Sequence, residues 1–399
     1  MNIHKSVARH VASAAVLGSA FCLVSPAFAQ EDDEGSKSPI AIEGSYKSDV
    51  VGVVDGGVAH GARYLDNLNL TAELDLESLV GWQGATAYAN VLNNLGGRPN
   101  DLVGSIQGVN NIEVSKTRFK LYEAWLEQSL GAVSVRAGLY DLNSEFYQND
   151  SSSLLISPPF GIGSELSATG PNGPSIFPST ALAVRVSATF GDSYVRGAVI
   201  NAKAGTIGDE QGVDIFGRDG TLLIGEAGWT GNGKIAVGAW RYTKDQPVID
   251  APDVSPEGTT HVSQGIYFTI EHPFVTKEGG ATVSGFVRGG IADGYTTPFV
   301  GGWQAGVLVD HIFASRPASS FSLGVGSAIL SRRFRDSSFV AGTPLRKTET
   351  IIEATYKDEI LPGLSLQPDI QYVINPSADP TIRNALILGL RVQFDFKAK

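Results

Sequence analysis

The sequence RNALILGLRVQFDF, at residues 383–396, decides the fold. Apolar residues stand at alternate positions from Leu386 to Phe396, and the positions between them include Arg391, Gln393 and Asp395. Because successive side chains of a β-strand point to opposite sides, this stretch predicts a strand with one apolar face and one mostly polar face. The apolar face could cover the core of a soluble sandwich. It could equally meet lipid, with the polar face lining the lumen of an outer-membrane barrel.

The N-terminal residues predict export. Residues 1–29 combine basic residues, an apolar run at 11–24 and the sequence Ala27-Phe28-Ala29, as in a cleaved signal peptide. A membrane anchor is the alternative, but the run is shorter than the roughly 20 residues that a spanning helix needs. We expect residues 30–39 to form an acidic tail and residues 40–399 to form the folded domain. No later run is long and apolar enough for a membrane helix, which leaves a barrel as the way to span a bilayer.

Short alternating segments follow one another along the rest of the chain and predict sixteen strands. We expect the strands to begin near Ile40, Tyr64, Gly84, Phe119, Val133, Ala181, Ser193, Thr221, Lys234, His261, Ala281, Trp303, Ser320, Arg346, Leu364 and Ala385. Short connections such as 131–132 and 191–192 alternate with long ones such as 95–117, 141–180 and 331–345. Outer-membrane barrels have short periplasmic turns and longer external loops. The predicted fold class is therefore all-β: a transmembrane antiparallel β-barrel of 16 strands.

The connection 141–180 is too long for a featureless loop in a compact domain. It contains four aromatic residues, among them Phe146 and Phe160, and five prolines. Aromatic residues pack and prolines stiffen, so we expect this loop to fold into the barrel and narrow it. A lid over the outer mouth is the alternative. Aromatic residues near strand ends are expected in interfacial girdles; they are Trp82, Trp125, Trp229, Tyr242, Phe274 and Phe313.

Charged residues of both signs fall on the polar faces of the predicted strands. The bases are Arg136, Arg185, Arg196, Arg288 and Arg391, and the acids are Glu123, Glu349, Glu353 and Asp369. A pore for one sign of ion would be lined with one sign of charge, whereas mixed donors and acceptors suit neutral solutes with many hydroxyl groups. The alternative is that these charges pair across the lumen and hold the strands.

Composition argues against several other functions. A net charge of -11 argues against a nucleic-acid partner, and the only cysteine, Cys22, lies within the predicted signal peptide. The motifs G-x-S-x-G, G-x-x-x-x-G-K-[ST] and H-E-x-x-H are absent from the sequence. The acidic run between Asp209 and Asp219 could hold calcium, but its spacing favours a solvated loop. We therefore predict no catalytic residues, no cofactor and no metal.

Four stretches resemble the carbohydrate-selective porin (OprB) family of bacterial outer membranes. They are LYEAWLEQSLGAVSVRAGLYDLNSEF from Leu121, FYQNDSSS from Phe146, FGIGSELSATGPNGPSIFP from Phe160 and SLQPDIQYVINP from Ser365. The resemblance implies an outer-membrane porin of sixteen strands that passes sugars by facilitated diffusion. It also implies an eyelet narrowed by an inward loop and lined by arginines and acids. A general or anion-preferring porin, a barrel enzyme and an adhesin are the alternatives, and monomer and trimer both stay open.

The resemblance extends to individual positions. Arg136, Tyr140, Asp141, Asn143, Glu145, Phe146, Asp369 and Gln371 match the family's motifs and are predicted to line the pore, together with Phe160, Arg185, Arg196, Arg288 and Arg391. Two short stretches depart from the family pattern. Ser157-Pro158-Pro159 replaces a more polar run, which bears on the sugar preference, and Lys397-Ala398-Lys399 follows Phe396, where a terminal phenylalanine is usual.

Overall fold

The computed structural model describes residues 38–210, 212–249, 258–276 and 280–398, so the predicted signal peptide and most of the predicted acidic tail lie outside it. The strands and helices, in chain order, are β1 (Ile40–Gly57), β2 (Gly61–Asp75), α2 (Leu76–Val80), β3 (Ala85–Gly96), α3 (Asn100–Val103), β4 (Arg118–Leu130), β5 (Val133–Tyr140), η1 (Leu142–Ser144), η2 (Asp150–Ser152), η3 (Pro158–Phe160), α4 (Ser164–Ser167), β6 (Ala181–Phe190), β7 (Ser193–Asn201), β8 (Thr221–Trp229), β9 (Lys234–Tyr242), β10 (Gln246–Pro247), β11 (Thr260–His261), β12 (Gln264–Thr276), β13 (Thr282–Ala292), β14 (Phe299–Asp310), β15 (Ser320–Leu330), α5 (Arg332–Val340), β16 (Thr348–Leu361), β17 (Leu364–Ile374), η4 (Pro376–Ala378) and β18 (Arg383–Ala398).

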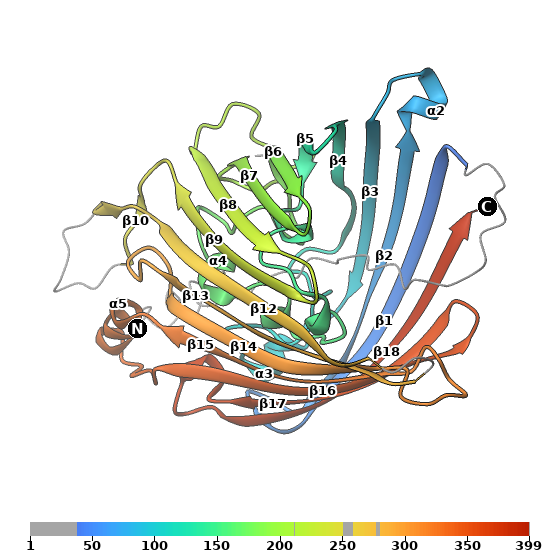
Figure 1. The fold of residues 1–399 in the computed structure, drawn as a ribbon. Coiled ribbons are helices and arrows are strands. Elements are labelled where there is room, and N and C mark those ends of the chain that lie inside the picture. Colours follow the sequence, from blue (N-terminus) through green and yellow to red (C-terminus); the bar gives the residue numbers. More distant parts are fainter. Residues whose placement is uncertain (1–37, 211, 250–257, 277–279, 399) are drawn as a thin grey trace.

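The strands form one closed antiparallel barrel (Figure 1). Sixteen strands, β1–β9 and β12–β18, pair in sequence order, and β1 closes the ring on β18. The two-residue strands β10 and β11 form a separate hairpin. Closure leaves no unpaired sheet edge, which satisfies the backbone hydrogen bonds along every strand. The prediction of a 16-stranded barrel is confirmed. No helix of the described residues is long and apolar enough to cross a membrane.

The alternation of the last strand separates its two faces as predicted. On β18, Leu388, Leu390 and Phe394 are 48%, 44% and 47% exposed, whereas Ile387 and Arg391 point inward and are buried. The same pattern recurs on β6, where Val184 and Val186 are exposed and Arg185 is buried. The outer surface of the barrel is therefore apolar, and charged groups gather inside it.

Strand starts agree with the expected ones to within four residues, and the differences have local causes. The ladder between β1 and β2 continues through Gly61, three residues before the expected start at Tyr64. His261 pairs with Gln246 in the small hairpin, so β12 begins only at Gln264. β14 begins at Phe299, earlier than Trp303, because Phe299 already pairs with Leu330 across a bulge. Residue pairing beside turns and in the small hairpin therefore explains why these strands begin at other residues than expected.

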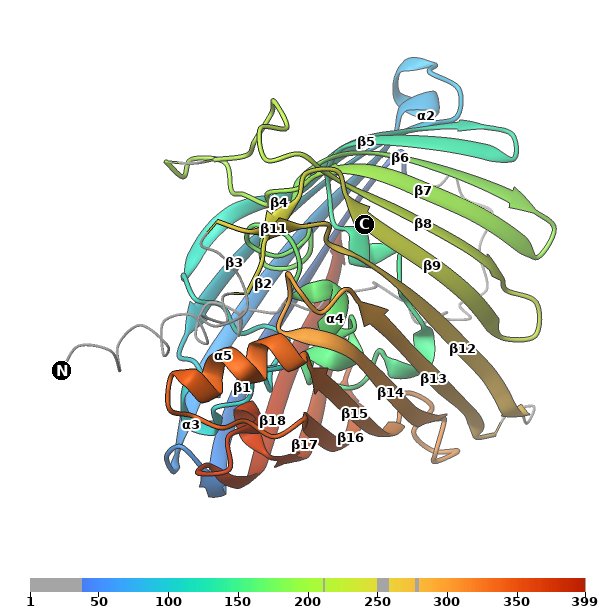
Figure 2. The ribbon, with the colours of Figure 1, turned by 90° about the vertical axis from the view of Figure 1, so that its left-hand side faces the viewer.

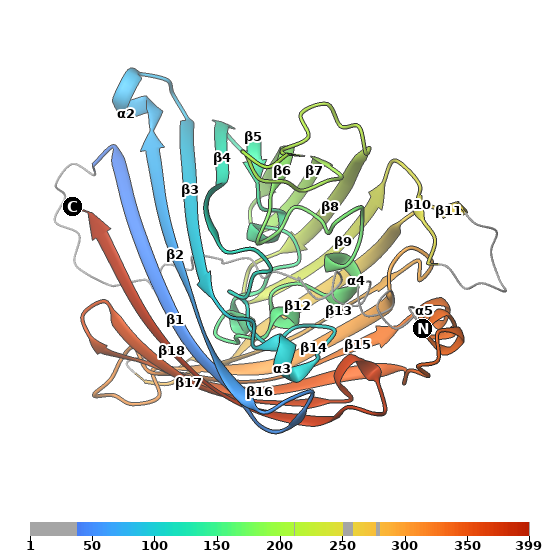
Figure 3. The same ribbon diagram turned by 180° about the vertical axis from the view of Figure 1, so that it is seen from behind.

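Two long connections, 97–117 and 141–180, lie inside the ring of strands (Figures 1 and 3). The segment 141–180 contains η1, η2, η3 and α4, and the segment 97–117 contains α3. Figure 2 shows that α5, from another connection, lies at the rim instead. Apolar residues of both segments join buried clusters with inward residues of the barrel, for example Phe146 with Trp240 and Val109 with Val373. The two segments therefore fill part of the interior of the barrel.

The predicted aromatic girdle includes two residues that the structure places inside. Trp82, Trp229, Phe274 and Phe313 are exposed and lie at the short-turn end of the barrel. The prediction is wrong for Tyr242, which is buried among inward residues, and for Trp125, which also faces the interior. Trp125 lies two residues after the inward Glu123, and the bulge in β4 opposite Asn90 and Val91 comes before Glu123, so the two side chains share the inward face.

Candidate functional site

Buried charged side chains attach the segment 141–180 to the barrel. Arg288 on β13 is fully buried and donates hydrogen bonds to three backbone carbonyls of that segment: Tyr147 at 3.1 Å, Gly161 at 3.0 Å and Pro159 at 2.7 Å. Its Nε also donates to Gln304 at 3.1 Å. Removing water from a guanidinium is costly unless its hydrogen bonds are replaced. The loop carbonyls replace them, so this arginine fixes the loop against the wall.

Two glutamates attach the same segment through backbone amides. Glu353 on β16 accepts from the amide of Ser157 at 2.8 Å and also from Ile156. Glu271 on β12 accepts from the amides of Asp150 at 3.0 Å and Ser151 at 2.6 Å. Hydrogen bonds to a carboxylate are stronger than bonds between neutral groups. The loop is therefore attached to at least three strands.

The segment 97–117 is attached in the same way on the neighbouring strands. Glu349 on β16 accepts from Ser105 Oγ at 2.7 Å and from the amide of Ile106 at 2.9 Å. Arg391 on β18 donates to Asp49 at 2.8 Å and to Asn111 at 2.7 Å. We did not expect this second inward segment. The sequence of this external loop does indicate such a course, because it contains apolar residues that the structure buries: Val103, Ile106, Val109 and Ile112.

These attachments define one side of the interior, which we call the packed wall. It consists of the inward residues Asp49, Glu271, Arg288, Glu349, Glu353, Gln371 and Arg391, which bind the two segments. The two segments also touch each other, because Ser164 Oγ donates to Gln107 at 3.2 Å.

Glu165 of α4 is a buried carboxyl group at the edge of the packed wall. Tyr147 donates a hydrogen bond to its Oε1 at 2.8 Å, and its Oε2 has no partner among the described residues. A Cβ at Gly290 or Gly302 would lie 2.3 Å from Oε1 or 3.0 Å from Oε2, so these glycines provide the space for the carboxyl group. Burial raises the pKa of Glu165 to about 7.

The opposite side, formed by the inward faces of β3–β7, keeps polar and aromatic groups partly exposed. Trp125 stacks on Tyr88, with ring centroids 4.7 Å apart and an interplanar angle of 18°. The guanidinium of Arg136 lies 3.7 Å from the centre of the Trp125 ring, and its Nε donates to Glu127 at 2.7 Å. We call Tyr88, Trp125, Glu127, Arg136 and Arg196, with Glu145 of the loop, the open wall.

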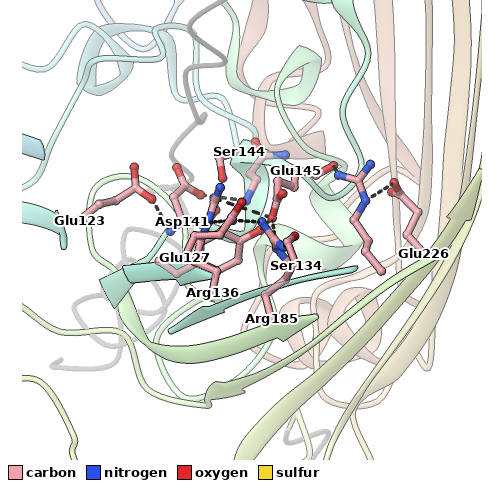
Figure 4. A network of polar contacts seen from close by, with 12 residues as sticks. Glu123, Glu127, Ser134, Arg136, Asp141, Ser144, Glu145, Arg185 and Glu226 are labelled. Atoms are coloured by element: carbon pink, nitrogen blue, oxygen red, sulfur yellow. Dashed lines mark hydrogen bonds and ion pairs between the residues drawn. The ribbon is translucent and has the colours of Figure 1, made fainter. Parts of the chain in front are cut away.

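Charges of the open wall form one network (Figure 4). Arg136 and Arg185 are direct cross-strand partners, which would repel each other without an intervening carboxylate. Glu127 binds Arg136 at 2.7 Å and Arg185 at 2.6 Å, and Glu145 binds Arg185 at 2.8 Å. Burial alone would raise the pKa of Glu145, but Arg136 and Arg185 together hold that pKa below its ordinary value. The acids therefore stay ionised and hold the arginines.

The network extends to the next strands through Arg196. Its NH1 donates to the carbonyl of Glu145 at 3.0 Å, and its Nε lies 3.8 Å from Glu226. Glu226 also accepts from the hydroxyls of Tyr194 at 2.7 Å and Tyr267 at 2.8 Å. The network therefore contains three arginines and three glutamates, so its formal charges cancel.

The predicted pore-lining residues fall into two groups by their exposure. The side chains of Arg136, Arg196 and Glu145 keep 15%, 16% and 19% of their surface exposed, and they lie together. The others are buried and bind protein groups: Tyr140, Asp141, Asn143, Phe146, Phe160, Arg185, Arg288, Asp369, Gln371 and Arg391. These ten do not present a free surface to solutes in this structure, because loop packing and ion pairs cover them.

Two of these buried residues, Asp141 and Asn143, show how the start of the long loop is fixed. Tyr122 donates to the carboxylate of Asp141 at 2.5 Å, and the amide of Asp141 donates to Glu123 at 3.0 Å. Burial raises the pKa of Asp141 to about 7. Asn143 donates to the carbonyls of Phe146 at 3.1 Å and Gly161 at 3.3 Å. The motif residues thus close the loop on itself as well as on the barrel.

No group of three or more potential metal ligands occurs within the part of the chain that the structure describes. In the acidic run of the external loop, Asp209 pairs with Arg118 and with Lys116 at 3.1 Å, and the pKa of Asp209 is lowered to about 2 by hydrogen bonds from these two residues. Asp214 accepts from backbone amides of its own loop. These carboxylates are thus occupied by protein groups.

Comparison with known proteins agrees with this geometry. The family model described as "Carbohydrate-selective porin, OprB family" matches residues 59–396. The chain belongs to the carbohydrate-selective porin family. It is therefore a sugar porin of the bacterial outer membrane.

Individual relatives match over most of their length. Porin B of Pseudomonas aeruginosa is 24% identical, with 89% of this chain and 84% of that protein covered. Putative porin QuiX of Acinetobacter baylyi is 22% identical, with coverage of 96% and 98%. The high-pH structure of Pseudomonas putida OprB superposes with a TM-score of 0.80 at 20% identity, covering 90% of this porin and 94% of that chain. At this identity the structural likeness supports the barrel fold of this porin.

Proposed function

We propose that sugars cross this porin by passive diffusion along the open wall. The observation that carries the proposal is the stack of Tyr88, Trp125 and Arg136, in which a guanidinium lies 3.7 Å from an indole ring inside the barrel. Tyr88 and Arg136 cover the two faces of the indole, so a sugar would meet the edges of this stack, where the guanidinium can donate to neighbouring hydroxyl groups. The packed wall leaves the solute little alternative surface of this kind.

Charge balance in the network favours a neutral solute. Three arginines face three glutamates, and every arginine has a carboxylate within 3.8 Å. An ion of either sign would gain attraction from one set of groups and meet repulsion from the other. A neutral solute with hydroxyl groups can both donate and accept, so it can bridge arginine and glutamate without an unpaired charge. This argument favours sugars over a general or anion-preferring pore.

Transport along the open wall requires that the sugar binds weakly. A solute held tightly would not leave, so each contact should contribute little and several should act in turn. The family and the fold indicate that the protein is a channel. We propose further that transport is passive and involves no catalysis. In support of this, the motif carboxylates of Asp141 and Glu145 already bind Tyr122 and Arg185.

Liposome swelling with purified protein tests the proposal. Glucose and other small neutral sugars should enter faster than neutral amino acids of similar size, and far faster than salts such as potassium gluconate. Added glucose should also reduce the single-channel current, because it occupies the open wall. Equal entry of all solutes of one size would contradict sugar selectivity, and faster entry of anions would favour an anion-preferring porin instead.

A further inference from the structure

The outer surface of the barrel carries a groove on strands β8, β9, β12 and β13, which lie side by side in Figure 2. Its volume is about 730 Å³. Leu223, Ile266 and Ile291, which line it, are 40%, 52% and 59% exposed, whereas Trp240 is buried in the interior cluster. The groove therefore lies on the lipid-facing side of the sheet and is separate from the sugar path.

Small residues make the floor of this groove. Gly225 pairs with Ala239, and Ala239 pairs with Ile266 on the next strand. A Cβ placed on Gly225 would have its nearest neighbour at 3.8 Å, so the space above it is open. Larger side chains border this floor, namely Leu223 on one side and Ile266 on the other. A chain-shaped apolar group can lie on such a floor with close van der Waals contact.

A cation stands at one end of the groove. Arg241 is exposed, pairs across the sheet with Leu223 and Gln264, and is the last outward residue of β9 before the long connection that follows. Among the described residues, the only hydrogen bond of its side chain is a long one, 3.4 Å, to Gln264. Because long connections are external in such barrels, Arg241 lies at the level of the outer leaflet.

This arginine differs from others at the external end of the barrel. Arg383 pairs with Asp55 at 3.1 Å, and Arg118 pairs with Asp209. Asp293, which also borders the groove, accepts through Oδ1 from the amides of Tyr295 at 2.7 Å and Thr296 at 2.9 Å in its own loop, and through Oδ2 from the amide of Gln264 at 3.4 Å. Arg241 therefore keeps a guanidinium, a group that binds phosphate with paired hydrogen bonds, beside an apolar groove.

We propose that this groove binds one phosphorylated, multiply acylated glycolipid of the outer leaflet, with an acyl chain over Gly225 and Ala239 and a phosphate on Arg241. Acyl chains are equally apolar in the bulk membrane, so the fit of the chain and the phosphate contact, and not burial as such, supply the preference for this site. The charge of Arg241 selects this lipid over an uncharged one. The shape of the floor selects one position for it on the barrel.

Native mass spectrometry of the delipidated, full-length porin in detergent tests the proposal. The probe is hexa-acyl lipid A with both phosphates, compared with the same lipid after enzymatic dephosphorylation. Wild type should bind one phosphorylated molecule before others, at least tenfold more tightly than the dephosphorylated form. Arg241→Gln should remove this preference, and Ala239→Trp should weaken both lipids by filling the groove.

Arg383→Gln is the matched control, because it removes an exposed arginine at the same end of the barrel that is already paired with Asp55. It should bind lipid A as wild type does. Heat-dependent gel mobility checks that each variant is folded, and glucose conduction should be unchanged in all three. Equal binding by wild type, Arg241→Gln and Ala239→Trp would overturn the proposal. So would a wild-type dimer that the two groove variants abolish, because a second copy would then occupy the groove.

Discussion

The two walls of the interior use the same residue types for different purposes. On the packed wall, Arg288 is fully buried and donates to three loop carbonyls. On the open wall, Arg136 keeps 15% of its side chain exposed and lies over an indole. Both are inward arginines on barrel strands. The difference lies in what covers them, so charge type and strand position alone do not identify the residues that meet a solute.

This contrast separates two contributions to selectivity. We propose that the packed wall sets the width of the path, because it fixes where the two inward segments lie. We propose that the open wall sets the chemistry of the path, because its groups remain accessible. Changes on the packed wall should therefore alter conductance and stability together, whereas changes on the open wall should alter sugar recognition with little effect on either.

The largest effect is expected from Arg288→Met. Methionine keeps much of the volume but leaves the carbonyls of Tyr147 and Pro159 and the side-chain oxygen of Gln304 without their donor in a buried site. Unsatisfied buried acceptors cost about 1–3 kcal/mol each, so we expect the segment to be displaced and the folded state to lose at least about 3 kcal/mol. Single-channel conductance should rise several-fold, and block by glucose should disappear.

Arg136→Met makes the same chemical change on the open wall and serves as the control. It should keep the wild-type conductance and thermal stability while weakening glucose block. If both variants changed conductance equally, the distinction between the two walls would fail.

A smaller effect is expected from the pH dependence of Glu165. Its pKa in the folded protein is about 7, raised by burial from 4.5, so the folded state keeps a proton that the unfolded chain releases above about pH 4.5. Stability should therefore fall as the pH rises from about 4.5 to 7, by up to about 3 kcal/mol, and change little from this source above 7. Glu165→Gln should remove this part of the pH dependence.

Thermal unfolding in detergent at pH 5 and pH 8 measures the effect. Other carboxyl groups titrate alike in both proteins, so the difference between the wild-type and Glu165→Gln curves isolates Glu165. Two parallel curves would show that this carboxyl group does not stay protonated in the folded state.

The sequence was informative about the barrel because lipid on one side and polar groups on the other impose a period of two. Leu388 and Leu390 therefore face outward, and Arg391 faces inward, as their alternation requires. The assignment of Trp125 to a girdle failed because it rested on the position of an aromatic residue near a strand end. Trp125 lies two residues after Glu123, in unbroken register, and therefore shares the inward face predicted for Glu123.

The division of the charges between two walls could not be predicted from the same pattern. Arg288 and Arg136 both occupy inward positions, and only the path of the loop 141–180 buries the first. The inward course of 97–117 was likewise missed, although its apolar residues, such as Ile106 and Val109, are unusual for an external loop. Contacts between segments far apart in the chain decide which of these side chains are buried, and such contacts cannot be inferred from a single sequence.

Recognition on the open wall is tested by Trp125→Ala. Losing the indole removes the ring that holds Tyr88 and the guanidinium of Arg136 in one stack, so glucose should bind about tenfold more weakly, which corresponds to about 1.4 kcal/mol. The concentration of glucose that halves the single-channel current measures this change. Trp303→Ala removes a tryptophan that is 42% exposed on the outer face and should leave glucose block unaltered. Equal sensitivity of the two variants would place the sugar path elsewhere.

The smallest effect is expected from Glu145→Gln, which tests the charge balance of the open wall. Glutamine keeps the shape of the side chain beside Tyr140 and Arg185 but removes one of three negative charges, leaving the network with a net positive charge. Anions should then permeate about twofold better relative to cations, which corresponds to about 0.4 kcal/mol, because the remaining charges are partly screened by water and salt. The reversal potential in a potassium chloride gradient measures the ratio. Asp192→Asn makes the same charge change in the exposed turn between β6 and β7, outside the network, and should leave the ratio at its wild-type value. If Glu145→Gln leaves the ratio unchanged too, ions do not pass these side chains, and the balanced charges of the open wall serve only to hold its arginines in place.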